Sequence, residues 1–144
     1  EDVIDAERDR GVAVGALGIG SFRPFPLDAV REALAGARRV VVVEKALSVG
    51  IGGPVSSNVR TALAGLDIPA ATVIAGLGGR PITRSSLHTM LAQARADELE
   101  PLTFLDMNWD VVNRELGRQQ ERRRSGPEAE NILRDIGTVA AGPV

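Results

Sequence analysis

The stretch RRVVVVE at residues 38–44 constrains the fold more than any other part of the sequence. Its four consecutive valines do not alternate with polar residues, which is typical of a strand that is buried on both faces. A glycine-rich turn at residues 50–53 follows, and then Pro54, a residue favoured in the first turn of a helix. This order of strand, turn and helix predicts a parallel sheet that helices cover on both sides.

The same order recurs through the first hundred residues. The sequence predicts helices over residues 2–10, 27–34, 54–64 and from Thr83 onward, strands over 12–19, 38–44 and 68–76, and an extended segment at 101–108. We therefore expect an α/β domain over residues 1–100. Its architecture is predicted to be a three-layer α/β/α sandwich around a mostly parallel sheet.

Residues 101–144 differ from the preceding domain. An amphipathic helix is predicted from Trp109 to Arg124, with Trp109, Val112 and Leu116 on one face and three arginines at its end. A short helix from Gly126 to about residue 136 and a flexible tail follow. The segment has too few apolar residues to form a core of its own. We expect a helical C-terminal extension that straps onto another domain or subunit.

Composition excludes several kinds of site. The sequence contains no cysteine, so it can form neither disulfides nor thiolate zinc sites, iron–sulfur clusters or cysteine nucleophiles. His88 is the single histidine, and we interpret it as a surface or packing residue. The net charge of -2 and the lack of a long apolar run indicate no affinity for nucleic acid or membranes, so we expect a cytoplasmic protein. The chain begins without Met, which suggests a piece of a longer polypeptide.

The first glycine loop, Gly50-Ile51-Gly52-Gly53, leaves two interpretations open. It is not a dinucleotide fingerprint, because Val55 stands where the third glycine belongs, and no GK[ST] follows as in a phosphate-binding P-loop. The free amides of a helix N-terminus can nevertheless bind an anion. Alternatively, the glycines only allow the backbone to turn tightly and to lie close to a neighbouring subunit or domain.

A second glycine loop, GLGGRPIT at residues 76–83, follows the next strand. Arg80 in this loop can clamp a carboxylate or phosphate, or it can form a salt bridge at an interface. Both loops follow the carboxyl ends of strands, the edge where open α/β sheets bind ligands. Glu44 is interpreted as part of a charge pairing at this rim rather than as a general base. The candidate residues for an interface or an anion-binding loop are Arg23, Glu44, Lys45, Gly50, Gly52, Gly53, Gly78, Gly79 and Arg80.

Several motifs in order carry a family resemblance: an RPFP turn, a strand ending in Glu44-Lys45, an S-x-G-x-G-G-P loop and a GLGGR loop. Over residues 3 to 95 the chain resembles the C-terminal part of the α subunit of 2-oxoacid:ferredoxin oxidoreductases such as pyruvate synthase. It is similar, more distantly, to the C-terminal domain of transketolases. Two features depart from the family pattern: the glycine-rich residues 16–20, and Glu-Lys where Asp-Arg is common.

The resemblance implies a transketolase C-terminal-like domain of about five strands, the first of which precedes residue 1. It implies a complex that oxidatively decarboxylates a 2-oxoacid to an acyl-CoA and passes the electrons to ferredoxin or another acceptor. Thiamine diphosphate with Mg would be held by an upstream domain and the β subunit, and iron–sulfur clusters by other subunits, including γ or δ. This domain would be a non-catalytic assembly domain without catalytic, cofactor or metal residues. The alternative is a regulatory module that binds a small anion or nucleotide through the glycine loops.

Overall fold

The computed structural model describes residues 2–122. The chain divides into two units, with the division after Asp106. The first unit contains α1 (Asp2–Asp9), α2 (Leu27–Leu34), α3 (Pro54–Ala62), α4 (Arg84–Ala96), a 3₁₀ turn η1 (Leu77–Gly79) and all the described strands. The described part of the second unit is dominated by helix α5 (Trp109–Arg122). None of the helices in residues 2–122 combines the length and apolarity that crossing a bilayer requires.

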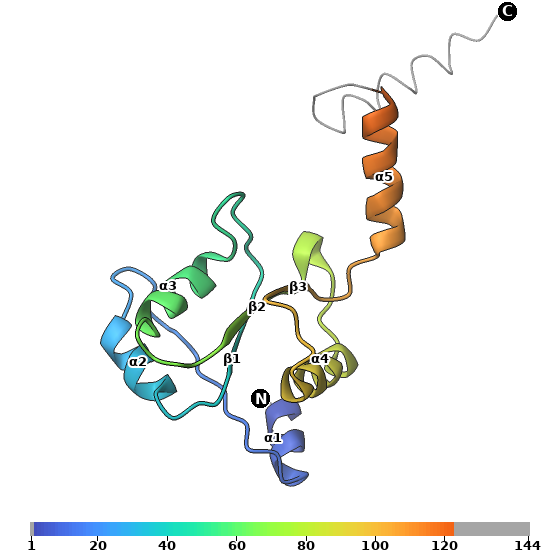
Figure 1. Ribbon diagram of the computed structural model, residues 1–144. Helices are drawn as coiled ribbons and strands as arrows, with labels where there is room; N and C mark the ends of the chain where they lie inside the picture. The colour runs from blue at the N-terminus through green and yellow to red at the C-terminus, as the bar shows by residue number, and fades with distance from the viewer. Residues whose placement is uncertain (1, 123–144) are drawn as a thin grey trace, which may run out of the picture. The chain divides into compact units, whose positions relative to one another are not determined.

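The sheet of the first unit consists of β1 (Val40–Glu44), β2 (Ala70–Ile74) and β3 (Leu102–Phe104) within the described residues. β2 lies between the other two strands and pairs with both in parallel, as Figure 1 shows. Parallel neighbours require a crossover connection, and α3 and α4 lie in the two crossovers. The prediction of a parallel α/β sheet is confirmed. Of the roughly five strands that the resemblance implied, the described residues contain these three.

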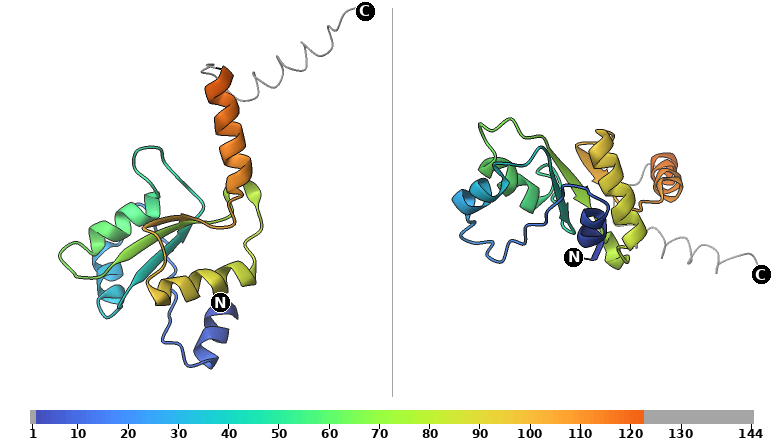
Figure 2. Two further views of the ribbon diagram at one scale, coloured as in Figure 1. Left: turned by 45° about the vertical axis from the view of Figure 1, so that its right-hand side comes forward. Right: turned by 90° about the horizontal axis from the view of Figure 1, so that it is seen from below.

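Helices cover both faces of this sheet, which confirms the three-layer α/β/α arrangement. Figure 2 shows α2 and α3 on one side of the strands and α4 on the other. The cluster under α2 and α3 contains Val30, Val40, Val42, Val59, Ala62 and Leu63. The cluster under α4 contains Ala71, Val73, Met90, Ala94 and Leu99. Alternate residues of the strands point to opposite faces, so neighbouring positions of β1 and β2 serve different clusters.

The helix boundaries follow local chemistry that the sequence predicted. α2 spans the predicted residues 27–34. Pro54 occupies the first turn of α3, where its missing amide hydrogen leaves no bond unmade. Thr83 caps α4, because its hydroxyl oxygen accepts a hydrogen bond from the amide of Ser86 at 3.0 Å. α1 is followed by Gly11 with a φ of 80°, a left-handed conformation that glycine adopts readily.

The strand predicted over residues 12–19 is wrong, since this segment has no regular structure. No residue of the segment is buried, and Leu17 is exposed. The carbonyl oxygen of Val14 accepts a hydrogen bond from Nε of Arg8 at 2.8 Å instead of one from a neighbouring strand. The apolar run was interpreted as a buried strand, but burial depends on a neighbouring strand that local sequence does not reveal.

Burial of β1 on both faces is also only partly correct. Val40 and Val42 are buried, whereas 43% of Val43 is exposed. β1 is hydrophobic over its first four residues and ends in the acid Glu44, and β2 carries Thr72 among apolar residues. The hydropathy of the four valines therefore predicted the strand, but not the exposure of one face near its carboxyl end.

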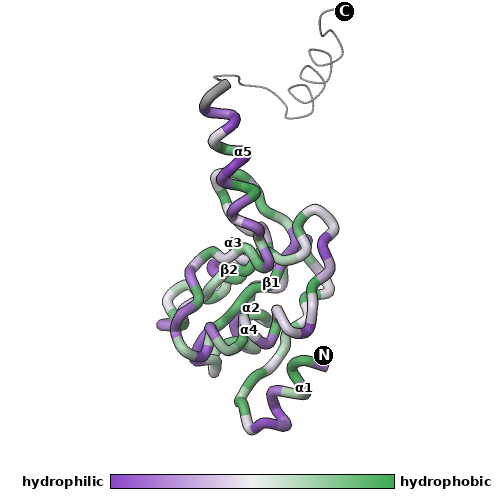
Figure 3. The backbone as a smooth tube through the Cα atoms, turned by 90° about the vertical axis from the view of Figure 1, so that its right-hand side faces the viewer, coloured by the Kyte–Doolittle hydropathy of each residue, from purple (hydrophilic) through white to green (hydrophobic). Residues whose placement is uncertain are grey.

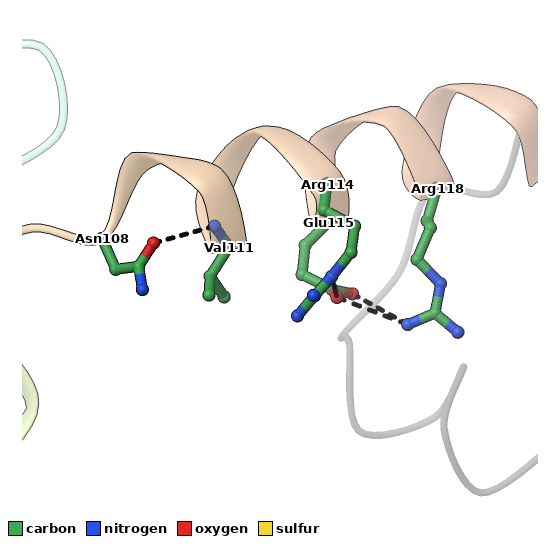
Figure 4. A network of polar contacts seen from close by, with 5 residues as sticks. All are labelled: Asn108, Val111, Arg114, Glu115 and Arg118. Atoms are coloured by element: carbon green, nitrogen blue, oxygen red, sulfur yellow. Dashed lines mark hydrogen bonds and ion pairs between the residues drawn. The ribbon is translucent and has the colours of Figure 1, made fainter.

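Helix α5 begins at Trp109, where the sequence predicted a helix. The side-chain oxygen of Asn108 accepts a hydrogen bond from the amide of Val111 at 3.2 Å, and Glu115 pairs with Arg118 (Figure 4). α5 is mostly hydrophilic in Figure 3. The three arginines at 122–124, the helix after Gly126 and the tail lie largely outside the described residues.

Candidate functional site

The two glycine loops lie at one edge of the sheet, which we call the carboxyl edge and define as residues 45–53 and 75–83. Glu44 is the last residue of β1 and pairs with Ile74, the last residue of β2. The amide of Ala75 donates a hydrogen bond to the carbonyl oxygen of Glu44 at 2.9 Å. Both loops therefore begin side by side.

The side chain of Glu44 reaches the N-terminus of α3. Its Oε2 accepts a hydrogen bond from the amide of Val55 at 2.9 Å, and its Oε1 accepts one from the amide of Ser56 at 2.9 Å. Oε1 also accepts the hydroxyl proton of Ser56 at 2.6 Å. Both residues are buried, with 7% and 1% of their surfaces exposed. The partial positive charge of the helix N-terminus stabilises the carboxylate.

This geometry replaces the charge pairing that the sequence suggested for Glu44. Its partners are two backbone amides and a hydroxyl group, and no ion pair to Glu44 or Lys45 occurs within residues 2–122. Lys45 is exposed, and its aliphatic chain lies against the second loop, with Cε 3.2 Å from the position of a Cβ built on Gly76. Glu44 and Lys45 at the end of β1 thus contact different parts of the chain, the start of α3 and the second loop.

Gly53 is required by the close approach of Glu44. A Cβ added to Gly53 would lie 1.9 Å from Oε1 and 2.4 Å from Cδ of Glu44. The φ of Gly53 is -75°, which any residue can adopt, so space rather than backbone conformation demands glycine here. The carboxylate fills the space at the helix N-terminus where an anion was considered.

Gly50 and Gly52 serve the turn itself. Their φ angles are 81° and 85°, and a Cβ on either would meet open space. Ser48 and Gly52 exchange two backbone hydrogen bonds of 2.8 Å, which close the loop into a small hairpin-like turn. Glycine is therefore favoured at both positions by the left-handed backbone conformation.

The second loop is built in a similar way. Gly78 and Gly79 have φ angles of 69° and 82°, and a Cβ on either would meet open space. Arg80, considered as an anion clamp, donates from Nη1 to the carbonyl oxygen of Asp106 at 2.9 Å. It ties the second loop to the chain that leaves β3.

Arg23 has local contacts. Its Nη1 donates to the carbonyl oxygen of Phe22 at 2.8 Å, and its guanidinium carbon lies 4.3 Å from the centre of the Phe22 ring. Phe22 also packs edge-on against Phe25. These contacts shape the turn before α2, and they do not join Arg23 to either glycine loop.

The carboxyl edge exposes apolar side chains that sequence reasoning missed. Val49 is 99% exposed and Ile51 is 67% exposed at the tip of the first loop. Leu47 in the same loop, and Leu77 and Ile82 in the second, are also exposed. The alternation Leu47, Val49, Ile51 inside a glycine-rich loop was the available signal, because polar residues are usual at such positions. A surface of this kind favours contact with another protein surface.

Comparison with known proteins adds the family. A sequence profile described as pyruvate:ferredoxin oxidoreductase core domain II matches residues 1–87. The chain belongs to this family. This confirms the resemblance that the RPFP turn and the two glycine loops carried. The matched region contains α1 to α3, β1, β2 and the carboxyl edge, and it ends within the first turn of α4.

Relatives of this core domain II chain are subunits of larger enzymes. It is 32% identical over 116 residues to pyruvate synthase subunit PorA of Pyrococcus furiosus, covering 76% of this chain and 29% of the relative. It is 39% identical over 84 residues to PorA of Thermotoga maritima, covering 56% and 21%. It is 31% identical over 101 residues to the α subunit of NADH-dependent phenylglyoxylate dehydrogenase of Aromatoleum evansii, covering 67% and 24%. The chain spans less than a third of the length of each of these relatives.

The residues of the carboxyl edge do not fit the cofactors that the family implies. The amides of Val55 and Ser56 at the start of α3 already bond to Glu44, so they do not offer a cradle for a diphosphate. Cysteine, the usual ligand of iron–sulfur clusters, is absent from the sequence. No three acidic or histidine side chains gather as a metal ligand set within residues 2–122.

Proposed function

We propose that this chain is a non-catalytic assembly domain of a thiamine diphosphate-dependent 2-oxoacid:acceptor oxidoreductase. Such a complex decarboxylates a 2-oxoacid such as pyruvate to an acyl-CoA and passes the electrons through iron–sulfur clusters to ferredoxin or another acceptor. The carboxyl edge of this chain is the docking surface for neighbouring domains or subunits. None of the side chains of this chain touches the substrate.

Membership of the core domain II family supports the proposal. The named relatives are a pyruvate synthase subunit and the α subunit of a phenylglyoxylate dehydrogenase, and both names refer to 2-oxoacids. Each relative is more than three times as long as the part that matches this chain. We infer that its partners are a thiamine-binding domain upstream in the same polypeptide and the β and γ or δ subunits. We also infer that the complex lies in the cytoplasm.

The observation that carries the proposal is that the amides at the N-terminus of α3 are already bonded to Glu44, while the tip of the first glycine loop exposes apolar side chains. The buried carboxylate of Glu44 holds the start of α3, so the first loop is anchored at its base. At the other end of the loop, Val49 and Ile51 face solvent. A loop that is fixed at its base loses little conformational freedom when its tip is buried by a partner.

The division of labour in the complex follows from this chemistry. Thiamine diphosphate supplies the carbanion chemistry that decarboxylation requires. This chain holds its two loops in fixed conformations through Glu44 and through the bond from Arg80 to Asp106. Its contribution to turnover is to place neighbouring domains and to exclude water where they meet.

Assembly of the complex tests the proposal. The chain would be expressed within its natural polypeptide, together with the other subunits of its oxidoreductase. The double variant Val49→Asp, Ile51→Asp is expected to lose the co-purifying subunits and the 2-oxoacid oxidation. The control Leu17→Asp changes an exposed apolar residue outside the carboxyl edge and is expected to assemble normally. Normal assembly of the double variant would reject the carboxyl edge as the docking surface.

Calorimetry separates this proposal from a regulatory module that binds a small anion or nucleotide. The chain would be titrated with thiamine diphosphate, CoA, ATP and inorganic phosphate. An assembly domain is expected to release no binding heat with any of them at micromolar concentrations. Micromolar binding of ATP or phosphate that Glu44→Ala strengthens would instead favour an anion site at the start of α3.

A further inference from the structure

Helix α1 lies next to α4, as Figures 1 and 2 show, and several ion pairs join the two helices. Val3 and Glu7 are the buried residues of α1 and share one face of that helix. Val3 belongs to neither of the two hydrophobic clusters that flank the sheet. Ile4 and Ala6 of α1 are half-buried, so the apolar surface that α1 buries is small and a set of charges adds to it.

The buried carboxylate of Glu7 is the centre of this set. Its Oε1 lies 2.7 Å from Nδ1 of His88 and 3.0 Å from Nη1 of Arg10, and its Oε2 lies 3.5 Å from Nη1 of Arg95. Only 7% of Glu7 is exposed. An ionised carboxylate has no proton to donate, so Nδ1 of His88 is the donor. A second ion pair, between Asp2 and Arg84, runs alongside.

The partners on α4 form a stripe. Arg84, His88 and Arg95 follow one another at intervals of four and seven residues, which places them on one face of the helix. α1 contributes the acids Asp2 and Glu7 that face them. An acidic face of α1 thus covers a cationic stripe of α4.

We propose that α1 is a releasable clip, held on the cationic stripe of α4 by the ionised carboxylate of Glu7, and that acid opens the clip while the sheet stays folded. On its C-terminal side, α1 is joined to α2 through residues 10–26, which have no regular structure, so α1 can move without pulling on any of the described strands. The clip concerns α1 and α4 alone, and it holds whether or not the carboxyl edge binds another subunit.

The direction of the pH dependence follows from the neighbours of Glu7. The hydrogen bond from His88 is the largest influence and lowers the pKa of Glu7 from its usual value of 4.5; burial opposes this, and the positive charges of Arg10 and His88 add to it. A carboxyl whose pKa is lowered in the folded state stabilises that state above the unfolded pKa. The stabilisation from ionised Glu7 is therefore lost as the pH falls below about 4.5 and then through the lowered pKa of Glu7 in the folded state.

Hydrogen exchange of the full chain, measured by mass spectrometry and corrected for intrinsic rates, tests the clip. In the wild-type protein, α1 amides are expected to lose protection below about pH 4.5 while those of β2 keep it. In Glu7→Gln, α1 is expected to exchange at least about tenfold faster at pH 7, with β2 unchanged. The control Asp5→Asn alters an acid that pairs with Arg8 inside α1, and it is expected to leave α1 protected.

A second variant tests the pH at which the clip opens. His88→Ala removes the hydrogen bond that most lowers the pKa of Glu7, so α1 is expected to open at a higher pH than in the wild type. An unchanged midpoint would contradict the assigned cause. Parallel loss of protection in α1 and β2, or wild-type protection of α1 in Glu7→Gln at pH 7, would overturn the clip itself.

Discussion

The carboxylate of Glu44 occupies the place at which a strand–glycine–helix unit holds a phosphate when it binds a nucleotide. It uses the same donors as a phosphate would, the amides at the start of α3. Gly53 leaves the space that the carboxylate fills. A glycine loop after a buried strand can therefore make room for a carboxylate of the same chain at the helix N-terminus.

Glu44→Ala is expected to destabilise the fold strongly. The substitution leaves two amides and the Ser56 hydroxyl buried without their acceptor, and hydrogen bonds to charged groups contribute about 1.5–3 kcal/mol each. We expect the free energy of unfolding to fall by at least about 2 kcal/mol, measured by urea denaturation. Glu32→Ala, at an exposed glutamate of α2, is the control and is expected to change it by less than about 0.5 kcal/mol. Equal effects of the two substitutions would refute the assigned role.

Gly53→Ala tests the close approach directly. Its methyl group would overlap the carboxylate of Glu44, so we expect a loss of about 1–3 kcal/mol in the free energy of unfolding. Gly18→Ala, where a Cβ meets open space, is the matched control. In a Glu44→Ala background the cost of Gly53→Ala should shrink, because the overlapping group is gone. Additive losses in this double-mutant cycle would show that the two positions act independently.

At the scale of elements, the helices could be predicted from sequence more closely than the strands or the site. α2 and the capping of α4 by Thr83 depend on residues within a few positions of one another, so local chemistry defines them. The strand predicted at residues 12–19 is wrong, because no strand among residues 2–122 pairs with this segment. Likewise, Glu44 and Ser56 are brought together only when α3 folds back on β1, and no periodicity encodes that contact.

Thr83→Ala is expected to weaken α4. The hydroxyl oxygen of Thr83 satisfies the amide of Ser86, which otherwise has no partner in the first turn of the helix. Loss of such a cap costs about 1 kcal/mol, so thermal unfolding followed by circular dichroism should shift downward by several degrees, about 4–8 °C per kcal/mol for a domain of this size. Ser85→Ala changes the neighbouring exposed serine and should leave the midpoint in place. A similar shift in both variants would point to helix propensity instead of capping.

At the scale of the whole molecule, the division after Asp106 places β3 in the same unit as the rest of the sheet. β3 pairs with β2, and the amide of Thr72 donates to the carbonyl oxygen of Pro101 while that of Leu105 donates to Ile74. Arg80 then bonds to the carbonyl oxygen of Asp106. The sequence predicted a domain over residues 1–100, because the alternation of predicted strands and helices stops there. The pairing of β3 cannot be predicted in this way, because its partner β2 lies thirty residues earlier in the chain.

Two truncations test this boundary. A chain ending after Asp106 retains all the contacts of β3, so we expect its thermal midpoint to stay within about 3 °C of the full chain, less than the shift from 1 kcal/mol. A chain ending after residue 100 loses β3 and leaves one edge of β2 unpaired, next to the buried Val73 and Ile74. Its midpoint should fall by about 10 °C or more, as expected for a loss of at least 2 kcal/mol. If both truncations melted alike, β3 would contribute nothing to the domain; if the longer one also failed, the first unit would depend on α5 or on residues beyond it.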